Sequence, residues 1–200
     1  GQETFWKDVV DGEGKVTGRE KTFNINEATQ YEIGDALPDV TGGFRTSFRW
    51  KNFDFMLAAA YQIGGRQWDG NSANVYSPGR AGFTASQDLV GNTWTPEHTN
   101  AKFPKLMFNG TWNFVDSNCD YLYRDASYFS LKTINVGYTL PKRWTSKICI
   151  ESLRVFFAAD NLYFTSAHTG FDPRTAYAGQ NAFGFPQAKT FTFGITMNLS

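Results

Sequence analysis

The sequence predicts an all-β protein of antiparallel strands, and three observations support this fold class. Aromatic residues make up 17% of the 200 residues, and 19 residues are glycine. Glycine-rich chains do not build long helices, and aromatic side chains are enriched in strands. Apolar and polar residues alternate along several segments, and short connections between these segments alternate with long ones. Because successive side chains of a strand point to opposite faces, the alternation predicts strands with one apolar face.

The last strand, predicted over residues 189–199, shows the alternation most clearly. One face would carry Phe191, Phe193, Ile195, Met197 and Leu199, and the other Thr190, Thr192, Gly194, Thr196 and Asn198. Residues 42–50 and 53–63 have the same pattern, and only Lys51-Asn52 separates them. These two segments therefore predict a hairpin with a short polar turn.

Two further strands are predicted over residues 124–140 and 151–163. In the first, the alternation slips between Leu131 and Ile134, which predicts a β-bulge. Pro141 ends this strand, because proline cannot donate a hydrogen bond to a ladder.

The connections between these strands are of two kinds. Lys51-Asn52 and residues 141–150 are short, whereas residues 64–123 and 164–188 are long. In an up-and-down sheet the short turns fall at one end and the long loops at the other, as in outer-membrane barrels. The last strand then ends on the short-turn side. Within the first long loop, residues 106–115 predict a hairpin or a packed segment.

Two architectures fit these strands. Five strands cannot close a barrel that spans lipid, and lipid does not tolerate open sheet edges. A membrane barrel would therefore take its other strands from elsewhere, with this chain as its C-terminal part. A soluble β-sandwich explains the alternation equally well, and its function would be that of a carbohydrate-binding module with exposed tryptophans. Periodicity leaves both architectures open.

Composition excludes several other classes of protein. Lys+Arg and Asp+Glu number 19 each, so the net charge is zero and no nucleic-acid partner is expected. No apolar run approaches the ~18–20 residues of a membrane-spanning helix. The chain begins at Gly1 in polar, loop-like sequence, so we expect either a processed chain or the C-terminal part of a longer one.

Six motifs occur in an order that resembles the C-terminal portion of the SusC/RagA family of TonB-dependent outer-membrane transporters of Bacteroidetes. The resemblance covers most of the chain, from about Tyr31 to the end. The motifs are IGDALPDVTGGFRTSFRWKNFDF, YQIGGRQWD, WTPEHTNAKFP, YRDASYFSLKTINVGYTLPKRW, LRVFFAADNLYFTSAHTGFDP and the last strand from Phe185-Pro186 onward. Each motif alone is weak, but six in order are specific.

The resemblance implies the C-terminal strands of a large antiparallel transmembrane β-barrel, of the plugged class of about 22 strands. Residues 1–41 would be an extracellular loop region leading into the barrel, and residues 42–200 would supply strands and long loops. The plug and the segment that contacts TonB would precede Gly1. A SusD-like surface lipoprotein would be the partner, and the cargo an oligosaccharide or a peptide. The protein would lie in membrane lipid and would not be an enzyme.

Two positions depart from the family pattern. The family usually has an acidic residue after Asp172-Pro173, where this chain has Arg174. Many outer-membrane proteins end in an aromatic residue, whereas this chain ends in Leu199-Ser200. We expect Asp172-Pro173 to form a turn in which the Asp side chain bonds to nearby backbone.

Five residues are candidates for substrate contact. Trp68, Trp94 and Trp112 lie on or near the first long loop, and aromatic faces stack on sugar rings. The alternative is that they pack the loop. Arg45 and Arg49 alternate with Phe44, Phe48 and Trp50. If those aromatic residues face lipid, both arginines face the lumen, because Arg on the lipid face costs ~2–4 kcal/mol. Lumenal arginines would bind substrate or pair with acidic plug residues.

The remaining chemistry-bearing residues predict no catalytic centre, metal site or cofactor. His98 and His168 are isolated, and no nucleophile, base and acid occur in a recognisable pattern. The topology places Cys119 at the extracellular end and Cys149 in a periplasmic turn. A disulfide requires Cα atoms within ~7 Å, so we expect none between them.

Overall fold

The computed structural model describes residues 4–76, 84–106, 120–146, 150–175, 180–181 and 185–199. The chain divides into two compact units. The first comprises residues 1–34 and 68–123, and the second comprises residues 35–67 and 124–200.

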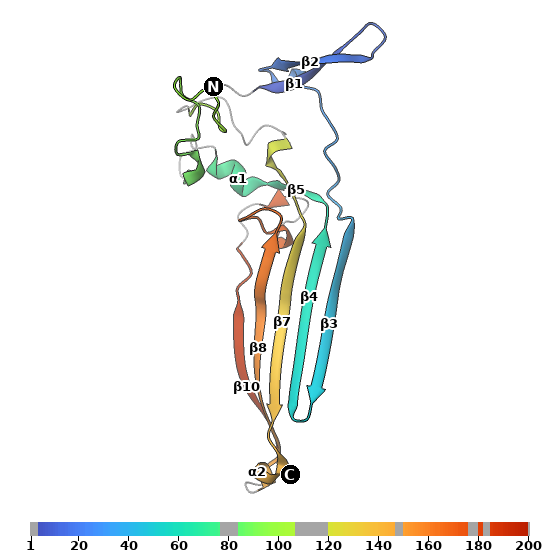
Figure 1. Ribbon diagram of the computed structural model, residues 1–200, viewed down its shortest axis with the longest axis vertical. Coiled ribbons are helices and arrows are strands. Elements are labelled where there is room, and N and C mark those ends of the chain that lie inside the picture. Colours follow the sequence, from blue (N-terminus) through green and yellow to red (C-terminus); the bar gives the residue numbers. More distant parts are fainter. Residues whose placement is uncertain are drawn as a thin grey trace. The chain divides into compact units, whose positions relative to one another are not determined.

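The second unit contains an antiparallel five-stranded sheet in the order β10-β8-β7-β4-β3 (Figure 1). Its strands are β3 Val40–Trp50, β4 Phe53–Ile63, β7 Tyr128–Thr139, β8 Ile150–Ser166 and β10 Thr190–Leu199. The predicted ranges 42–50 and 53–63 correspond to β3 and β4. The predicted range 124–140 is divided in the structure, because it covers the end of β6 Tyr123–Asp125 and the whole of β7. The predicted bulge is confirmed, because the pairing of β7 with β8 shifts register between Leu131 and Thr133.

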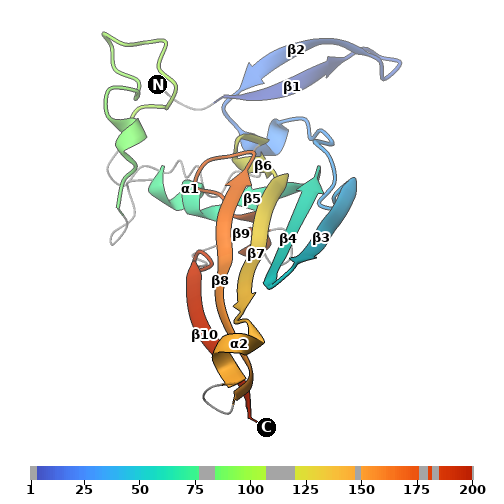
Figure 2. The same cartoon turned by 60° about the horizontal axis from the view of Figure 1, so that its bottom comes forward.

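The short connections lie at one end of this sheet. Trp50 pairs with Phe53 across the turn Lys51-Asn52, and Lys51 adopts a φ of 53°. At the same end, α2 Lys142–Thr145 follows β7, and Leu199 near the chain terminus pairs with Ile150. Figure 1 shows the β3–β4 turn, α2 and the C-terminus at this end, and Figure 2 shows the twist between the strands. We call it the short-turn end.

Register divides the side chains of the sheet between two faces, because directly paired residues share a face. The apolar face comprises Phe44, Phe48, Trp50, Phe53, Phe55, Leu57, Ile134, Val136, Tyr138, Val155, Phe157, Phe191, Phe193, Ile195 and Met197. The polar face comprises Arg45, Ser47, Arg49, Asp54, Thr133, Asn135, Gly137, Arg154, Phe156, Thr192, Gly194 and Thr196.

The apolar face decides between the two predicted architectures. A sandwich would bury this face against a second sheet, but its largest side chains are exposed: 60% for Phe48 and 80% for Phe193. Phe157 contacts Phe191 and Phe193 with ring centroids 6.1 and 4.8 Å apart, so the aromatic groups pack side by side along the face. The sheet is therefore a section of barrel wall with open edges at β3 and β10, and the sandwich alternative is wrong.

The first unit begins with a hairpin of β1 Phe5–Val10 and β2 Val16–Thr22, within the range predicted as a loop region, and continues into the 3₁₀ turn η1 Ile25–Glu27. Tyr31 donates a hydrogen bond to the Asp8 carboxylate, which raises the pKa of the phenol. The unit also contains α1 Gly70–Val75, η2 Gln87–Leu89 and η3 Asp120–Leu122. None of the helices in the described ranges has the length and apolar character needed to cross a membrane.

Three short strands, β5 Arg66–Asp69, β6 and β9 Gln180–Asn181, form a further sheet in the order β6-β5-β9. The last 3₁₀ turn, η5 Pro173–Thr175, lies in the connection that follows β8.

Candidate transport surface

An ion-pair network ties three strands together on the polar face near the short-turn end. Arg154 of β8 donates from Nε to Asp54 Oδ1 at 2.9 Å and from Nη2 to Asp54 Oδ2 at 2.5 Å. Its Nη2 also donates to Asn135 Oδ1 of β7 at 3.1 Å. The bidentate fork matches the planar guanidinium to the planar carboxylate, which is the strongest geometry for this pair.

Gly137 leaves the space through which this pair crosses β7. Asp54 lies directly opposite Gly137, and Arg154 reaches across from the next strand. A Cβ atom at Gly137 would lie 2.4 Å from Arg154 Nη2 and 2.5 Å from Asp54 Oδ1. Glycine is therefore required here by the side chains above it rather than by its own backbone angle.

Beside this network, an aromatic ring occupies the space above a second glycine. The Phe156 ring lies over Gly194 of β10, where an added Cβ would be 2.2 Å from the ring. Arg154 Cζ lies 5.1 Å from the centroid of the same ring. Further along, Thr133 donates to Asp160 at 2.8 Å. The polar face thus has fixed rather than freely solvated side chains over β7, β8 and β10.

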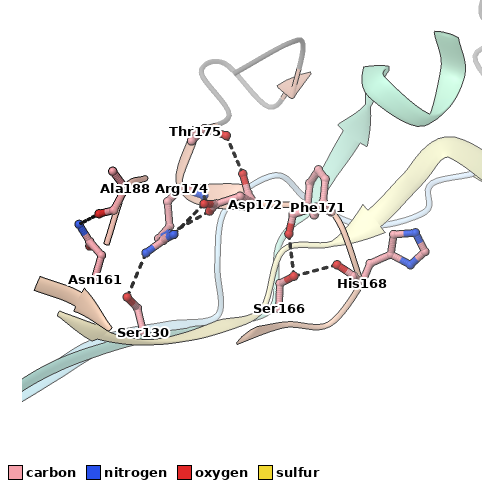
Figure 3. Close-up of polar contacts among 9 residues, drawn as sticks. All are labelled: Ser130, Asn161, Ser166, His168, Phe171, Asp172, Arg174, Thr175 and Ala188. Atoms are coloured by element: carbon pink, nitrogen blue, oxygen red, sulfur yellow. Dashed lines mark hydrogen bonds and ion pairs between the residues drawn. The ribbon is translucent and has the colours of Figure 1, made fainter. Parts of the chain in front are cut away.

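The connection after β8 folds back over the polar face at the opposite end of the sheet (Figure 3). Ser130 pairs with Ala60 and with Phe164, which places all three residues on the polar face. Arg174 Nη1 donates to Ser130 Oγ at 3.0 Å, and Arg174 Cζ lies 3.9 Å from the centroid of the Phe164 ring. We call residues 167–175 the folded-back segment.

Asp172 completes the contacts of Arg174. Arg174 donates from Nε and Nη2 to Asp172 Oδ1 and Oδ2 at 2.9 and 2.7 Å, and its backbone N–H donates to Oδ1 at 3.0 Å. The Asp172 carbonyl accepts from Thr175 Oγ1 at 2.9 Å. The predicted Asp-Pro turn with an Asp-to-backbone bond is therefore confirmed. The Arg174 side chain is 8% exposed, so this pair is shielded from solvent.

Ser166 fixes the start of the same segment. Its Oγ lies 2.8 Å from the His168 carbonyl and 2.6 Å from the Phe171 carbonyl, and Phe171 is 2% exposed. The folded-back segment is thus held at both ends, by Ser166 and by Arg174.

The candidate residues fall in different units. Arg45 and Arg49 lie on the polar face, opposite Phe44, Phe48 and Trp50, as the alternation predicts. Arg45 Nη2 lies 2.9 Å from Met56 Sδ, and Arg49 pairs across the strands with Asp54.

Trp68 and Trp94, the two described tryptophans among the candidates, belong to the first unit. Trp68 and Tyr121 are partly buried and pack against a buried cluster of Ala73 and Leu122. Trp94 is half-buried, and its backbone N–H donates to the Phe103 carbonyl at 2.9 Å. Trp112, Cys119 and Cys149 lie outside the described residues. Among those described, no group of three or more His, Cys, Asp or Glu side chains is placed to hold a metal ion.

The sequence did not predict the two arginine networks. Asp54 and Arg154 are 100 residues apart, and Ser130 and Arg174 are 44 residues apart. No local signal marks Asp54 as the partner of Arg154, because the two residues and Gly137 come from three strands that are distant in the sequence. No local signal marks Ser130 as the partner of Arg174.

Comparison with known proteins supports the resemblance that the motifs predict. No protein-family profile matches the chain. The TonB-dependent receptor P3 of Formosa agariphila is 30% identical over 199 residues, and SusC of Bacteroides thetaiotaomicron is 24% identical over 201 residues. These matches cover 94% and 96% of the chain but only 18% and 19% of the relatives. Over nearly its whole length the chain is similar to TonB-dependent receptors, SusC among them, as the six motifs predict.

Solved structures agree on the fold. A RagAB structure described as a peptide importer in the "closed-closed" state superposes with a TM-score of 0.75 and 21% identity, over 97% of this chain and 22% of that one. The "open-open" state of the same importer gives 0.75 and 22%. The five-stranded sheet is therefore part of an outer-membrane β-barrel. Its relatives are receptors and importers, not enzymes.

Proposed function

We propose that this chain is a section of the wall of an active importer of the outer membrane, with the polar face lining the passage. The chain spans about a fifth of its relatives, so the activity belongs to the complete protein. The observation that carries the proposal is the division of one sheet between an exposed apolar face and a face of paired charges. Lipid tolerates only the first of these, and a water-filled lumen suits the second.

The cargo of this importer is an oligosaccharide or a peptide. The similarity to the RagAB peptide importer supports a peptide, and the oligosaccharide follows from the resemblance of the sequence motifs to the SusC/RagA family. Import is energised through TonB, and a SusD-like surface lipoprotein is the partner. Arg45 and Arg49 are the polar-face residues that we assign to contact with cargo or with acidic residues of the plug. We also assign Trp68, Trp94 and Trp112 to contact with cargo, because aromatic faces stack on sugar rings.

The test is growth of a strain in which the complete protein is the sole importer for the supplied nutrient. Cultures receive either mixed oligosaccharides or mixed peptides, with and without a functional TonB. We expect growth on one nutrient class only, and only when TonB is functional. Growth that does not depend on TonB would contradict energised import, and growth unchanged by deletion of the protein would contradict import altogether.

The partner is tested separately by affinity purification of the complete protein from the outer membrane. We expect a surface lipoprotein in stoichiometric amount. Purification of the protein without a lipoprotein, under conditions that preserve its barrel, would contradict this part of the proposal.

A further inference from the structure

Two exposed indoles with stacked cations occupy the short-turn end of the five-stranded sheet. Trp50 is 57% exposed, and the Lys51 ammonium lies 4.8 Å from the centroid of its ring. Trp144 of α2 is 54% exposed, and Arg143 Cζ lies 5.7 Å from the centroid of its ring. We call Trp50, Lys51, Phe53, Tyr138, Arg143 and Trp144 the rim.

The rim continues the apolar face. Trp50 pairs with Phe53, and Phe53 pairs with Tyr138, so three aromatic side chains stand in one row across β3, β4 and β7. The Phe53 and Tyr138 rings lie 4.7 Å apart. Aromatic side chains at strand ends sit where hydrocarbon meets the headgroup layer. This row therefore indicates where the layer of lipid headgroups lies along the strands.

The rim also carries net positive charge. Lys51, Lys142 and Arg143 lie at this end, and among the described residues the acidic side chains nearby are Asp54 and Glu151. Asp54 lies on the polar face and is held by Arg154. Of these two acidic residues, Glu151 alone is left to offset the charges of Lys51, Lys142 and Arg143.

We propose that the rim binds anionic phospholipids, with Lys51 and Arg143 each contacting the phosphate of a headgroup. A cation that stacks on an indole keeps its outward N–H groups available, and the indole beneath holds it at the level of the phosphate. Short turns of outer-membrane barrels face the periplasm, so the lipid belongs to the inner leaflet. This interaction is additional to import and does not depend on the cargo.

The test is native mass spectrometry of the complete, delipidated transporter titrated with phosphatidylglycerol or phosphatidylcholine of identical acyl chains. The wild-type protein should retain phosphatidylglycerol preferentially, because each cation near an anionic headgroup favours it by about fivefold. The double variant Lys51→Gln/Arg143→Gln should bind both lipids nearly equally. Lys51→Arg/Arg143→Lys should retain the preference and shows that the rim tolerates substitution.

The matched control is Arg45→Gln, which removes a cation from the polar face of the same strand as Trp50. We expect it to leave the lipid preference unchanged. Equal binding of the two lipids by the wild type would overturn the proposal, and so would a preference that survives Lys51→Gln/Arg143→Gln or disappears in Arg45→Gln. Fractionation of the cells before the transporter is extracted reports on the membrane location independently of this result.

Discussion

The two faces of the five-stranded sheet are built from alternate residues of the same strands, yet they are suited to opposite surroundings. The apolar face leaves large side chains exposed, from 37% for Val136 to 80% for Phe193. The polar face carries networks around Arg154 and Arg174, and the further cations Arg45 and Arg49. The apolar face is stable beside hydrocarbon, and the polar face is stable beside water because its charged and hydroxyl groups are solvated or hydrogen-bonded there. The face to which a residue points therefore decides which substitutions the sheet tolerates at that position.

The largest expected effect comes from a charge on the apolar face. Phe193→Arg should destabilise the barrel by about 2–4 kcal/mol, because the guanidinium would face the hydrocarbon layer. Thr192→Arg places the same group on the neighbouring residue of the polar face and should cost far less. Denaturant unfolding of the two reconstituted proteins measures both. Equal destabilisation by the two substitutions would mean that the faces do not meet different solvents.

The second largest loss of stability is expected from breaking the network around Arg154. Asp54→Asn should cost about 1–3 kcal/mol, because it removes the charged acceptor of a half-buried guanidinium and leaves its donors without a carboxylate. Ser47→Ala, on the polar face of β3, is the control and should change stability little. Denaturant unfolding is again the measurement. A stability equal to wild type for Asp54→Asn would show that the pair is not a structural link between β4 and β8.

A smaller and local effect is expected at the folded-back segment. Arg174→Lys keeps the charge but loses the bidentate fork and the planar contact with Phe164. Amide exchange of residues 171–175 should accelerate by roughly tenfold, while exchange in β7 should be unchanged. Hydrogen–deuterium exchange of the complete protein measures both regions. Unaltered protection of residues 171–175 would show that Arg174 does not hold this segment.

The smallest effect is expected from Arg45, whose side chain contacts Met56 rather than a carboxylate. Arg45→Gln should change stability by less than about 0.5 kcal/mol. If Arg45 contacts cargo or the plug, the same substitution should instead alter uptake. A stability loss as large as that of Asp54→Asn would place Arg45 in a structural network.

The sequence predicted the strands and the division of their faces, because both follow from a period-two pattern that each strand carries by itself. Phe44 and Arg45 illustrate this, since their neighbours on the same strand already assign them to opposite faces. The hairpin of β1 and β2 was not predicted. Its second strand, VTGREKT, is polar and exposed on both faces, so no alternation marks it.

The networks could not be predicted for a different physical reason. The partner of Arg154 depends on which strands are neighbours and on their register, and neither is recorded in β8 itself. The partner of Arg174 depends on how a connection folds over the sheet. The sequence marks Arg174 only as a departure from the family pattern, whereas the structure shows it bonded to the aspartate two residues before it.

Spin labels on β10 test most directly whether the apolar face of this sheet meets lipid and the polar face meets an aqueous passage. Single cysteines replace Phe191, Thr192, Phe193, Ile195, Thr196 and Met197 in the complete protein, with Cys119 and Cys149 changed to serine. Collisions with oxygen report lipid, and collisions with a nickel chelate report water. Oxygen should dominate at Phe191, Phe193, Ile195 and Met197, and not at Thr192 or Thr196. Equal oxygen collision rates at all six positions, or the inverse alternation, would contradict the account.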